Sequence, residues 1–172
     1  MTHRIFIGLQ LPESFHKTLA DWRMQHADWP VRWTKTGDLH LTLIAPWEVE
    51  SVQPVINAFY TLNGFFNNQT LTFADIKFLH PDQPKMLWVE GSASPELLEM
   101  KQRLHTLLER TTEEQPFRPH VTLARCWPDE VQNYKDKTEP VNWPVTCTGL
   151  TLFESRRDQF GSRYRTLATV EA

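Results

Sequence analysis

The sequence predicts an α+β fold built from two similar strand–helix–strand units. Apolar runs of strand type alternate along the chain with stretches whose apolar residues recur at helical spacing. The order strand, helix, strand also occurs twice, at an offset of 35 residues from Ile5 to His40 and 33 residues from Leu87 to His120. Both units end on the phrase His-x-Thr-Leu. No low-complexity segment or charge block divides the chain, so we expect residues 1–172 to form one domain of two pseudo-repeated lobes.

Composition limits the class of protein. A chain of 172 residues with 40% hydrophobic residues and seven Trp can bury one sizeable core. Its net charge of −3 indicates neither a polyanion-coating protein nor a disordered tail. Two cysteines, Cys126 and Cys147, are too few for a disulfide framework or a four-ligand zinc site. Since no apolar run approaches the roughly 18 residues of a membrane span, we expect a soluble, unprocessed, cytoplasmic protein with no membrane partner.

The first unit starts with the apolar run RIFIGLQL, residues 4–11, which predicts a buried strand ended by Pro12. A helix is expected next, with Ser14 as its N-cap. The apolar residues of this helix recur at helical spacing: Phe15, Leu19 and Trp22. The run LHLTLI, residues 39–44, then predicts the second strand of the unit.

Between the units, Ser51 is expected to cap a short helix that ends at Gly64. The runs LTFADIKFL (71–79) and KMLWVEG (85–91) predict two strands, separated by the turn-like segment HPDQP. The second unit continues with a helix predicted over residues 95–110. Its apolar side would hold Leu97, Met100, Leu104, Leu107 and Leu108.

The C-terminal part begins with HVTLA (120–124), a predicted strand that completes the second unit. A helix is predicted over residues 129–137. The runs VTCTGLTLFES (145–155) and RYRTLATV (163–170) predict a closing pair of strands around a turn at Gly161.

The strand setting gives the repeated phrase its chemical meaning. Side chains alternate across a strand, so His40 and Thr42 share one face while the leucines of the phrase point to the other. His120 and Thr122 repeat this arrangement. The same pattern begins at His16, but in a predicted helix, where residues two apart diverge by roughly 200° around the axis. If the two halves face each other about a pseudo-twofold axis, two histidines and two threonines converge on one cleft.

Such a quartet suits displacement at phosphorus. Histidine titrates near neutrality, so one imidazole can take a proton from water while the other gives a proton to the departing alkoxide. Threonine hydroxyls can hydrogen-bond the non-bridging oxygens, where charge sits in the transition state. A metal site is the weaker interpretation, because neither phrase contains an Asp or Glu and threonine is a poor zinc ligand.

The chain resembles the 2H phosphoesterase superfamily, in particular its 2′-5′ RNA ligase-like, RNA 2′,3′-cyclic phosphodiesterase branch. The resemblance lies in RIFIGLQLP, HLTL, RPHVTLAR and LFESRRDQFGSRYRTL, in that order, and covers most of the chain. It implies a bilobal fold of two antiparallel sheets flanked by helices, with the two motifs facing across a central groove. It also implies metal-independent opening of a 2′,3′-cyclic phosphate to a 2′-phosphate without a cofactor, and in some members the joining of RNA ends by a 2′-5′ linkage.

Roles follow from the resemblance by motif. His40 would be the acid that protonates the ribose leaving oxygen, and His120 the base that activates water. Thr42 and Thr122 would contact the phosphate. Arg125 matches the arginine of the family and would be a phosphate ligand, but simple alternation puts it on the face opposite His120. It therefore requires the strand to end or bulge after Ala124.

Three further residues are candidates around the groove. Arg118 has the same parity as His120 and is a candidate phosphate contact, with solvent exposure as the alternative. Tyr164 and Phe153 match family positions, where an aromatic ring could stack on a base. For Phe153 core packing is the favoured role.

The chain departs from the family just after the first motif, where relatives tend to have an apolar-apolar-Gly-Glu run. Residues 45–48 read Ala-Pro-Trp-Glu instead, which leaves base preference and substrate length open. Trp47 could offer a stacking surface, but we expect it to cap the core.

The expected partners are RNA 3′ ends or nucleotides that bear a 2′,3′-cyclic phosphate, and a monomer is expected. Several arginines cluster late in the sequence and allow an anionic-ligand patch: Arg118, Arg125, Arg156, Arg157, Arg163 and Arg165. Three alternatives stay open: 2′-5′ RNA ligation, hydrolysis of another cyclic nucleotide derivative, and non-catalytic binding of nucleotides or RNA ends.

Overall fold

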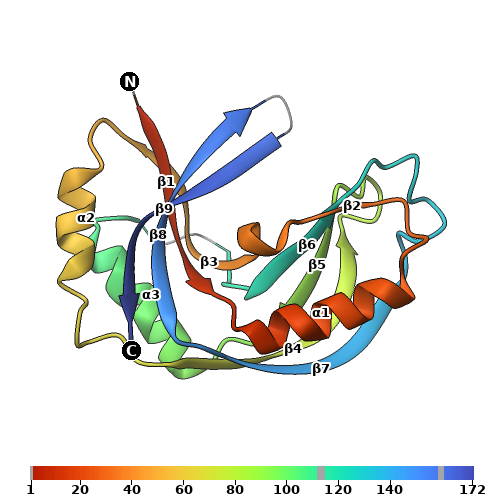
Figure 1. Ribbon diagram of the computed structural model, residues 1–172, viewed down its shortest axis with the longest axis horizontal. Coiled ribbons are helices and arrows are strands. Elements are labelled where there is room, and N and C mark those ends of the chain that lie inside the picture. The colour runs from red at the N-terminus through yellow and green to blue at the C-terminus, as the bar shows by residue number, and fades with distance from the viewer. Residues whose placement is uncertain (1, 112–114, 159–160) are drawn as a thin grey trace.

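The computed structural model describes residues 2–111, 115–158 and 161–172 (Figure 1). The elements follow in this order: β1 (His3–Gln10), α1 (Glu13–Gln25), β2 (Arg32–Trp33), the 3₁₀ turn η1 (Thr36–Asp38), β3 (His40–Val49), α2 (Gln53–Tyr60), β4 (Gln69–Leu79), β5 (Met86–Gly91), α3 (Pro95–Leu107), β6 (His120–Arg125), β7 (Thr138–Cys147), β8 (Gly149–Asp158) and β9 (Gly161–Glu171).

The strands form antiparallel neighbours in the order β7-β4-β5-β6-β3-β1-β8-β9, and β2 pairs with β6. At the centre, β3 and β6 share a single registered pair, Leu41 opposite Val121. This point divides the strands into a first lobe, β3-β1-β8-β9, and a second lobe, β6-β5-β4-β7, with matching strand positions. The predicted α+β fold of two pseudo-symmetric antiparallel halves is therefore confirmed.

The helices of the two units are exchanged between the lobes. Helix α1 follows β1 of the first lobe but packs on β7 of the second. The ring of Phe15 in α1 lies 5.5 Å from that of Phe73 in β4 and 5.9 Å from that of Trp143 in β7. Helix α3 follows β5 of the second lobe but contacts β3 of the first lobe as well as β4 of its own, and it lies next to α2 on the side of β8 and β9 (Figure 1). Each lobe is thus covered by the helix of the other unit.

The buried faces of α1 and α3 agree with the predicted spacing. In α1 the predicted positions Phe15, Leu19 and Trp22 are buried. In α3 the buried apolar residues are Leu97, Met100 and Leu104. Leu107 and Leu108, at the end of the predicted stripe, are only partly buried against the core.

Both predicted serine N-caps are wrong. Helix α1 begins two residues earlier than a cap at Ser14 would place it, because the Pro12 carbonyl accepts the amide of Phe15 at 3.0 Å, and Ser14 lies inside the helix. Ser51 precedes the cap position of α2, which Val52 occupies without a side-chain cap. The cap that forms is at α3, where the Ser94 hydroxyl accepts the amide of Leu97 at 3.1 Å.

The helix predicted over residues 129–137 is also wrong. The segment is a series of turns, closed by bonds such as Glu130 N–H to the Trp127 carbonyl and Lys137 N–H to the Tyr134 carbonyl. Val131 is its one fully buried apolar side chain, so the segment lacks the apolar stripe that would hold a helix on the core.

The strand predicted over residues 145–155 is divided at Thr148. Strand β7 pairs with β4 in the second lobe, whereas β8 pairs with β1 in the first. The start of β7 escaped prediction because it contains Pro140 and Pro144, which an edge strand such as β7 tolerates. The closing β8–β9 pair is confirmed. It flanks residues 159–160, so the turn predicted at Gly161 lies partly outside the described residues.

In the described part of the chain, no helix is both long enough and apolar enough to cross a membrane.

Close packing of β4 against β5 gives a test of the fold. A Cβ on Gly91 would lie 2.4 Å from the Thr72 carbonyl oxygen, whereas a Cβ on Gly37 would meet nothing within 4 Å. We expect Gly91→Ala to lower the free energy of unfolding by about 1–3 kcal/mol, and Gly37→Ala to change it by less than about 0.5 kcal/mol. Urea unfolding followed by circular dichroism measures both. Equal stabilities of the two variants would contradict the packing described here.

Candidate active site

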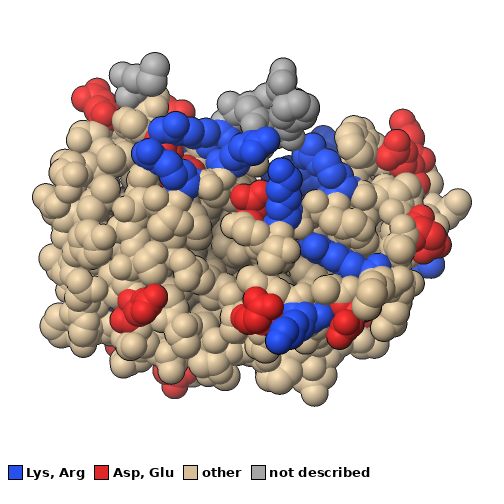
Figure 2. Space-filling model, viewed as in Figure 1, with Lys and Arg blue, Asp and Glu red and all other residues tan. Residues whose placement is uncertain are grey.

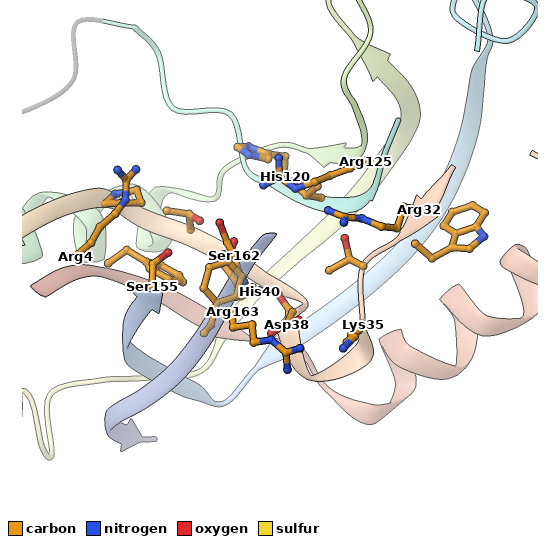
Figure 3. Close-up of a pocket in the computed structure, with 17 residues that line it drawn as sticks. Arg4, Arg32, Lys35, Asp38, His40, His120, Arg125, Ser155, Ser162 and Arg163 are labelled. Carbon is orange, nitrogen blue, oxygen red and sulfur yellow. Dashed lines mark hydrogen bonds between the residues drawn. The ribbon is translucent and has the colours of Figure 1, made fainter. Parts of the chain in front are cut away.

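The two His-x-Thr phrases occupy the adjacent central strands β3 and β6. Around the Leu41–Val121 pair, the antiparallel register brings His40 level with Thr122, and Thr42 level with His120. All four polar side chains line one cavity of about 710 Å³ (Figure 3). The structure therefore brings together the quartet that the sequence predicts.

Both imidazoles are oriented by the same local bond. Nδ1–H of His40 donates to the Asp38 carbonyl at 2.7 Å, and Nδ1–H of His120 donates to the Arg118 carbonyl at 2.8 Å. A carbonyl oxygen can only accept, so the proton of each neutral ring sits on Nδ1. Nε2 of each ring is left as the nitrogen for proton transfer.

A bulge in each strand follows the threonine. Opposite β1, the register passes from Thr42 to Ile44 and leaves Leu43 as an extra residue. Opposite β5, the register passes from Thr122 to Ala124 in the same way. The bulge in β6 reverses the alternation, so that Arg125 lines the cavity with His120. The bulge that Arg125 requires is present, but before Ala124 rather than after it.

The carbonyls at these bulges bind cations from the exchanged helices. Nζ of Lys101 in α3, a buried side chain, donates to the Leu43 carbonyl at 2.6 Å. The Arg23 guanidinium in α1 donates to the carbonyls of Leu123 at 3.3 Å and Thr34 at 3.0 Å. Each His-x-Thr strand is thus hydrogen-bonded to the helix of the other unit. The bond lies at the bulge, where the alternation of side chains along the strand is reversed.

The two histidines rest on different supports. Trp88 in β5 registers with Thr122, and its ring stacks on His120 at 3.5 Å with an interplanar angle of 13°. The matching position in β1 is Gly8, where a Cβ would lie 2.8 Å from the Leu41 carbonyl oxygen. Nothing in the sequence pattern singled out Trp88, because the contact crosses between strands.

Aromatic rings surround His40. The centroids of Phe6 and Tyr164 lie 4.8 and 5.0 Å from that of His40, and Tyr164 presents an edge. Tyr164 also lines the cavity, as the resemblance implies. Phe153 is 8% exposed, and its ring stacks on that of Phe6 with 4.9 Å between the centroids. It therefore packs in the core, which is the role favoured from the sequence.

Burial lowers the pKa of both catalytic candidates. For His40, desolvation is opposed by the bond to the Asp38 carbonyl, while the charge of His120 lowers the pKa further. For His120, desolvation is opposed by the bond to the Arg118 carbonyl and by the Glu90 carboxylate. Both rings therefore favour the neutral form more than a histidine in water does.

Arg118 does not line the cavity. Its guanidinium binds the Glu90 carboxylate, with Nε 3.1 Å from Oε1, and Lys77 lies on the same carboxylate. Burial alone would raise the pKa of Glu90, but these two cations lower it overall. The geometry gives Arg118 a different role from the predicted phosphate contact, because its carbonyl orients His120.

Trp47 packs against the core, and the guanidinium of Arg110 lies 5.4 Å from its ring centroid. It is not among the residues that line the cavity. The expectation that it caps the core is therefore confirmed.

Several cavity residues were missed by sequence reasoning. The late arginine cluster drew attention to Arg163, but Arg4 and Arg32 carried no signal. Arg32 lies in β2, which is only two residues long and shows no strand pattern. The full set that was missed comprises Arg4, Phe6, Arg32, Trp33, Thr34, Lys35, Asp38, Ser155 and Ser162.

Residues 11–159 match the sequence profile of the 2′-5′ RNA ligase superfamily. The chain belongs to this superfamily. An RNA 2′,3′-cyclic phosphodiesterase of Aeropyrum pernix is 31% identical over 104 residues, which are 55% of this chain and 59% of that protein. The match thus spans well under two thirds of this curated relative.

Solved structures share the fold of this chain. Apo LigT of E. coli superposes with a TM-score of 0.76 and 25% identity over 99% of this chain and 97% of LigT. TT0787 of Thermus thermophilus gives a TM-score of 0.75 at 17% identity, over 98% and 97% of the two chains. The fold is that of the 2H phosphoesterases, as the resemblance implied.

The crossed ties between helices and bulges can be tested without an activity assay. We expect Lys101→Met to shift the amide resonances of residues 42–44 more than those of residues 122–124, because the Leu43 carbonyl loses its donor. Arg23→Met should do the reverse. Gln102→Met, an exposed neighbour on α3, serves as the control. ¹H–¹⁵N spectra measure the changes, and equal disturbance of both strands by Lys101→Met would contradict the crossed arrangement.

Proposed function

We propose that this protein hydrolyses the 2′,3′-cyclic phosphate of an RNA 3′ end, or of a nucleotide, to a 2′-phosphate. The observation that carries the proposal is the pair of imidazoles in one cavity, each with Nδ1 held by a backbone carbonyl and each beside a threonine. Two orientation-locked bases around one phosphate are what a coupled acid and base require.

In the proposed reaction, Nε2 of His120 takes a proton from water as the water oxygen bonds to phosphorus. The bond from phosphorus to the ribose 3′ oxygen breaks, and Nε2 of His40 gives that oxygen a proton. The family resemblance supplies this direction, since the geometry of the two phrases is nearly symmetric. Each cycle ends when His40 regains a proton and His120 loses one.

The remaining cavity residues stabilise charge and bind the nucleoside. The hydroxyls of Thr42 and Thr122 donate to the non-bridging oxygens, where negative charge grows in the transition state. Arg125 supplies a positive charge at the end of β6. The exposed side of Tyr164 offers a surface for a base.

The comparisons support the class of reaction and of ligand that we propose. The Aeropyrum pernix relative is named for the same reaction. LigT has been solved in complex with NADP⁺, a nucleotide that carries a 2′-phosphate as the proposed product does. The cytoplasmic location, the monomeric state and turnover without a metal or cofactor stay predictions.

2′-5′ RNA ligation is a second candidate. The cavity extends beyond the histidines on both sides, from Arg4 and Ser155 at one end to Arg32 and Lys35 at the other (Figure 3). The 5′-hydroxyl group of a second RNA strand, bound in the part of the cavity that the first strand leaves free, could attack the cyclic phosphate in place of water. The product, a 2′-phosphate or a 2′-5′ linkage, distinguishes the two reactions.

The decisive assay uses an RNA that ends in a 2′,3′-cyclic phosphate, in the presence of EDTA. We expect turnover by the wild type, and His40→Ala and His120→Ala each to lower kcat by about 10²–10⁴-fold. His16→Ala, whose histidine belongs to the same sequence pattern on helix α1, should retain activity. A wild type that binds the RNA end without hydrolysis would instead support the non-catalytic alternative.

The pH dependence follows from the two lowered pKa values. As pH rises through the pKa of His120 the base becomes neutral and kcat/KM rises; as pH rises through the pKa of His40 the acid is lost and kcat/KM falls. Because burial lowers the pKa of both histidines from that of a histidine in water, we expect a bell-shaped profile whose maximum lies on the acid side of the ordinary histidine pKa. Initial rates with chemistry rate-limiting measure it, and a flat profile from about pH 5 to pH 8 would contradict paired-imidazole catalysis.

A further inference from the structure

The indole ring of Trp88 lies flat against the imidazole of His120. The two centroids are 3.5 Å apart, and the two planes are within 13° of parallel. Trp88 is not among the described residues that line the cavity, so it reaches a bound substrate only through His120. The bond from Nδ1 to the Arg118 carbonyl sets the direction of the imidazole, and the stack sets its plane.

The N–H group of this indole has no acceptor. Nε1 of Trp88 is buried, and within the part of the chain that the structure describes it has no hydrogen-bond partner. A buried donor without an acceptor destabilises a fold, and a phenylalanine ring would fill much of the same space without that cost. Among aromatic side chains, however, tryptophan attracts a cation most strongly to its face. The choice of tryptophan is therefore explained by its contact with His120 rather than by stability.

The equivalent position beside His40 holds no ring. Gly8 occupies in β1 the place that Trp88 occupies in β5, and a Cβ on Gly8 would lie 3.5 Å from Cδ2 of His40. Of the two imidazoles, only that of His120 has a parallel aromatic face among the described residues. The rings beside His40 are tilted or perpendicular to it, at interplanar angles of 42°, 41° and 88° for Phe6, Phe153 and Tyr164.

This asymmetry matches the way in which charge moves in the proposed reaction. His120 starts neutral and becomes an imidazolium when it takes the proton of water, whereas His40 starts as an imidazolium and becomes neutral. An aromatic face stabilises the charged ring. Beside His120 it therefore stabilises the transition state relative to the ground state, and beside His40 it would do the reverse.

The charged groups around His120 come from β3, β4, β5 and the segment before β6. Burial lowers the pKa of His120, the bond to the Arg118 carbonyl and the Glu90 carboxylate raise it, and the charge of Arg118 lowers it. The Glu90 carboxylate is itself bound by Arg118 and Lys77. His40 faces the same cavity from β3. Together these groups leave the protonated form of His120 disfavoured.

The cavity is also lined by cations. Arg4, Lys35 and Arg125 are among its lining residues, and Figure 2 shows Lys and Arg side chains gathered in the upper half of the face in view. Positive charge attracts a phosphate but disfavours a protonated imidazole. A carboxylate placed against His120 would favour the protonated ring but repel the phosphate. The face of Trp88 attracts the cation without adding a negative charge to the site.

We propose that Trp88 is a positioning residue of the reaction: its indole holds the plane of the His120 ring and stabilises the imidazolium that forms as this ring takes the proton of water. The inference rests on the proposed function, including the assignment of His120 as the base. It gives a part in the rate to a residue that lies outside both His-x-Thr phrases and outside the cavity.

NMR titration of the His120 imidazole tests the stack without turnover. In Trp88→Leu, which keeps an apolar contact but has no aromatic face, we expect the proton affinity of His120 to fall at least about 2-fold, with a titration midpoint at lower pH. The ring-current shift of the imidazole protons should disappear as well. Trp47→Leu, which removes a tryptophan that packs on the core outside the cavity, should leave the His120 titration unchanged. An unchanged midpoint in Trp88→Leu would overturn the inference.

A variant that keeps the shape of the ring separates charge from packing. 5-Fluorotryptophan, introduced at position 88 alone, has a weaker attraction for cations because fluorine withdraws electron density from the ring. We expect it to lower the proton affinity of His120 by less than Trp88→Leu does, and Trp88→Phe to give an intermediate value. Thermal unfolding shows whether each variant is folded. If Trp88→Leu does not fold, these two variants give the test, and wild-type titration in both would overturn the inference.

The kinetic test uses an RNA that ends in a 2′,3′-cyclic phosphate. Trp88→Leu should lower kcat by about 5- to 30-fold and leave KM nearly unchanged, because the stack stabilises charge that develops only in the transition state. The acid limb of the kcat/KM profile should move to lower pH while the alkaline limb stays in place. A raised KM with unchanged kcat, or movement of the alkaline limb instead of the acid limb, would overturn the inference.

The two measurements separate this inference from the proposed hydrolysis. If the wild type hydrolyses no cyclic phosphate but the proton affinity of His120 falls in Trp88→Leu, the stabilisation of the imidazolium is supported and the proposed function fails. If the wild type hydrolyses the RNA and Trp88→Leu keeps both the wild-type kcat and the wild-type titration of His120, the proposed function stands and the role of Trp88 is overturned.

Discussion

The contact between β3 and β6 is the constraint on which the site depends. A single registered pair, Leu41 and Val121, joins the lobes, and both residues are fully buried. Because side chains alternate along a strand, anchoring these two positions turns the neighbouring histidine and threonine of each strand toward the cavity. A one-residue slip at this pair would send the polar side chains of one phrase into the core.

The exchanged helices add a second level of constraint. The strands diverge on either side of the central pair, and each then bulges, which would leave carbonyl groups poorly paired in a buried region. Lys101 and Arg23 satisfy those carbonyls from α3 and α1. Unsatisfied buried carbonyls cost about 1–3 kcal/mol each, so the two ties stabilise the bulges and hold the lobes in a fixed relation. Although the two halves are nearly symmetric, the two histidines have different surroundings. The ring of Trp88 stacks on His120, whereas Gly8, at the matching position, has no side chain, and His40 packs against Phe6 and Tyr164.

Local periodicity predicted what depends on a single segment. The strands around both phrases, the buried face of α1 and the pairing of β8 with β9 all follow from spacing along the chain. Features that depend on a partner strand could not be predicted in this way. The start of β7 contains prolines, which argue against a strand unless it lies at the edge of a sheet, and β2 is too short to show alternation. In the same way, the bonds of Arg118 to Glu90 and the stack of Trp88 on His120 require the β5–β6 register, which no single run of residues encodes.

The central claim is that both imidazoles act on one phosphate. Its most direct test is the ¹⁵N spectrum of histidine side chains during titration with inorganic phosphate. Nε2 of His40 and of His120 should shift together with a single dissociation constant, and the His16 signal should stay in place. A response from only one of the two imidazoles, or two separate midpoints, would contradict a shared phosphate site.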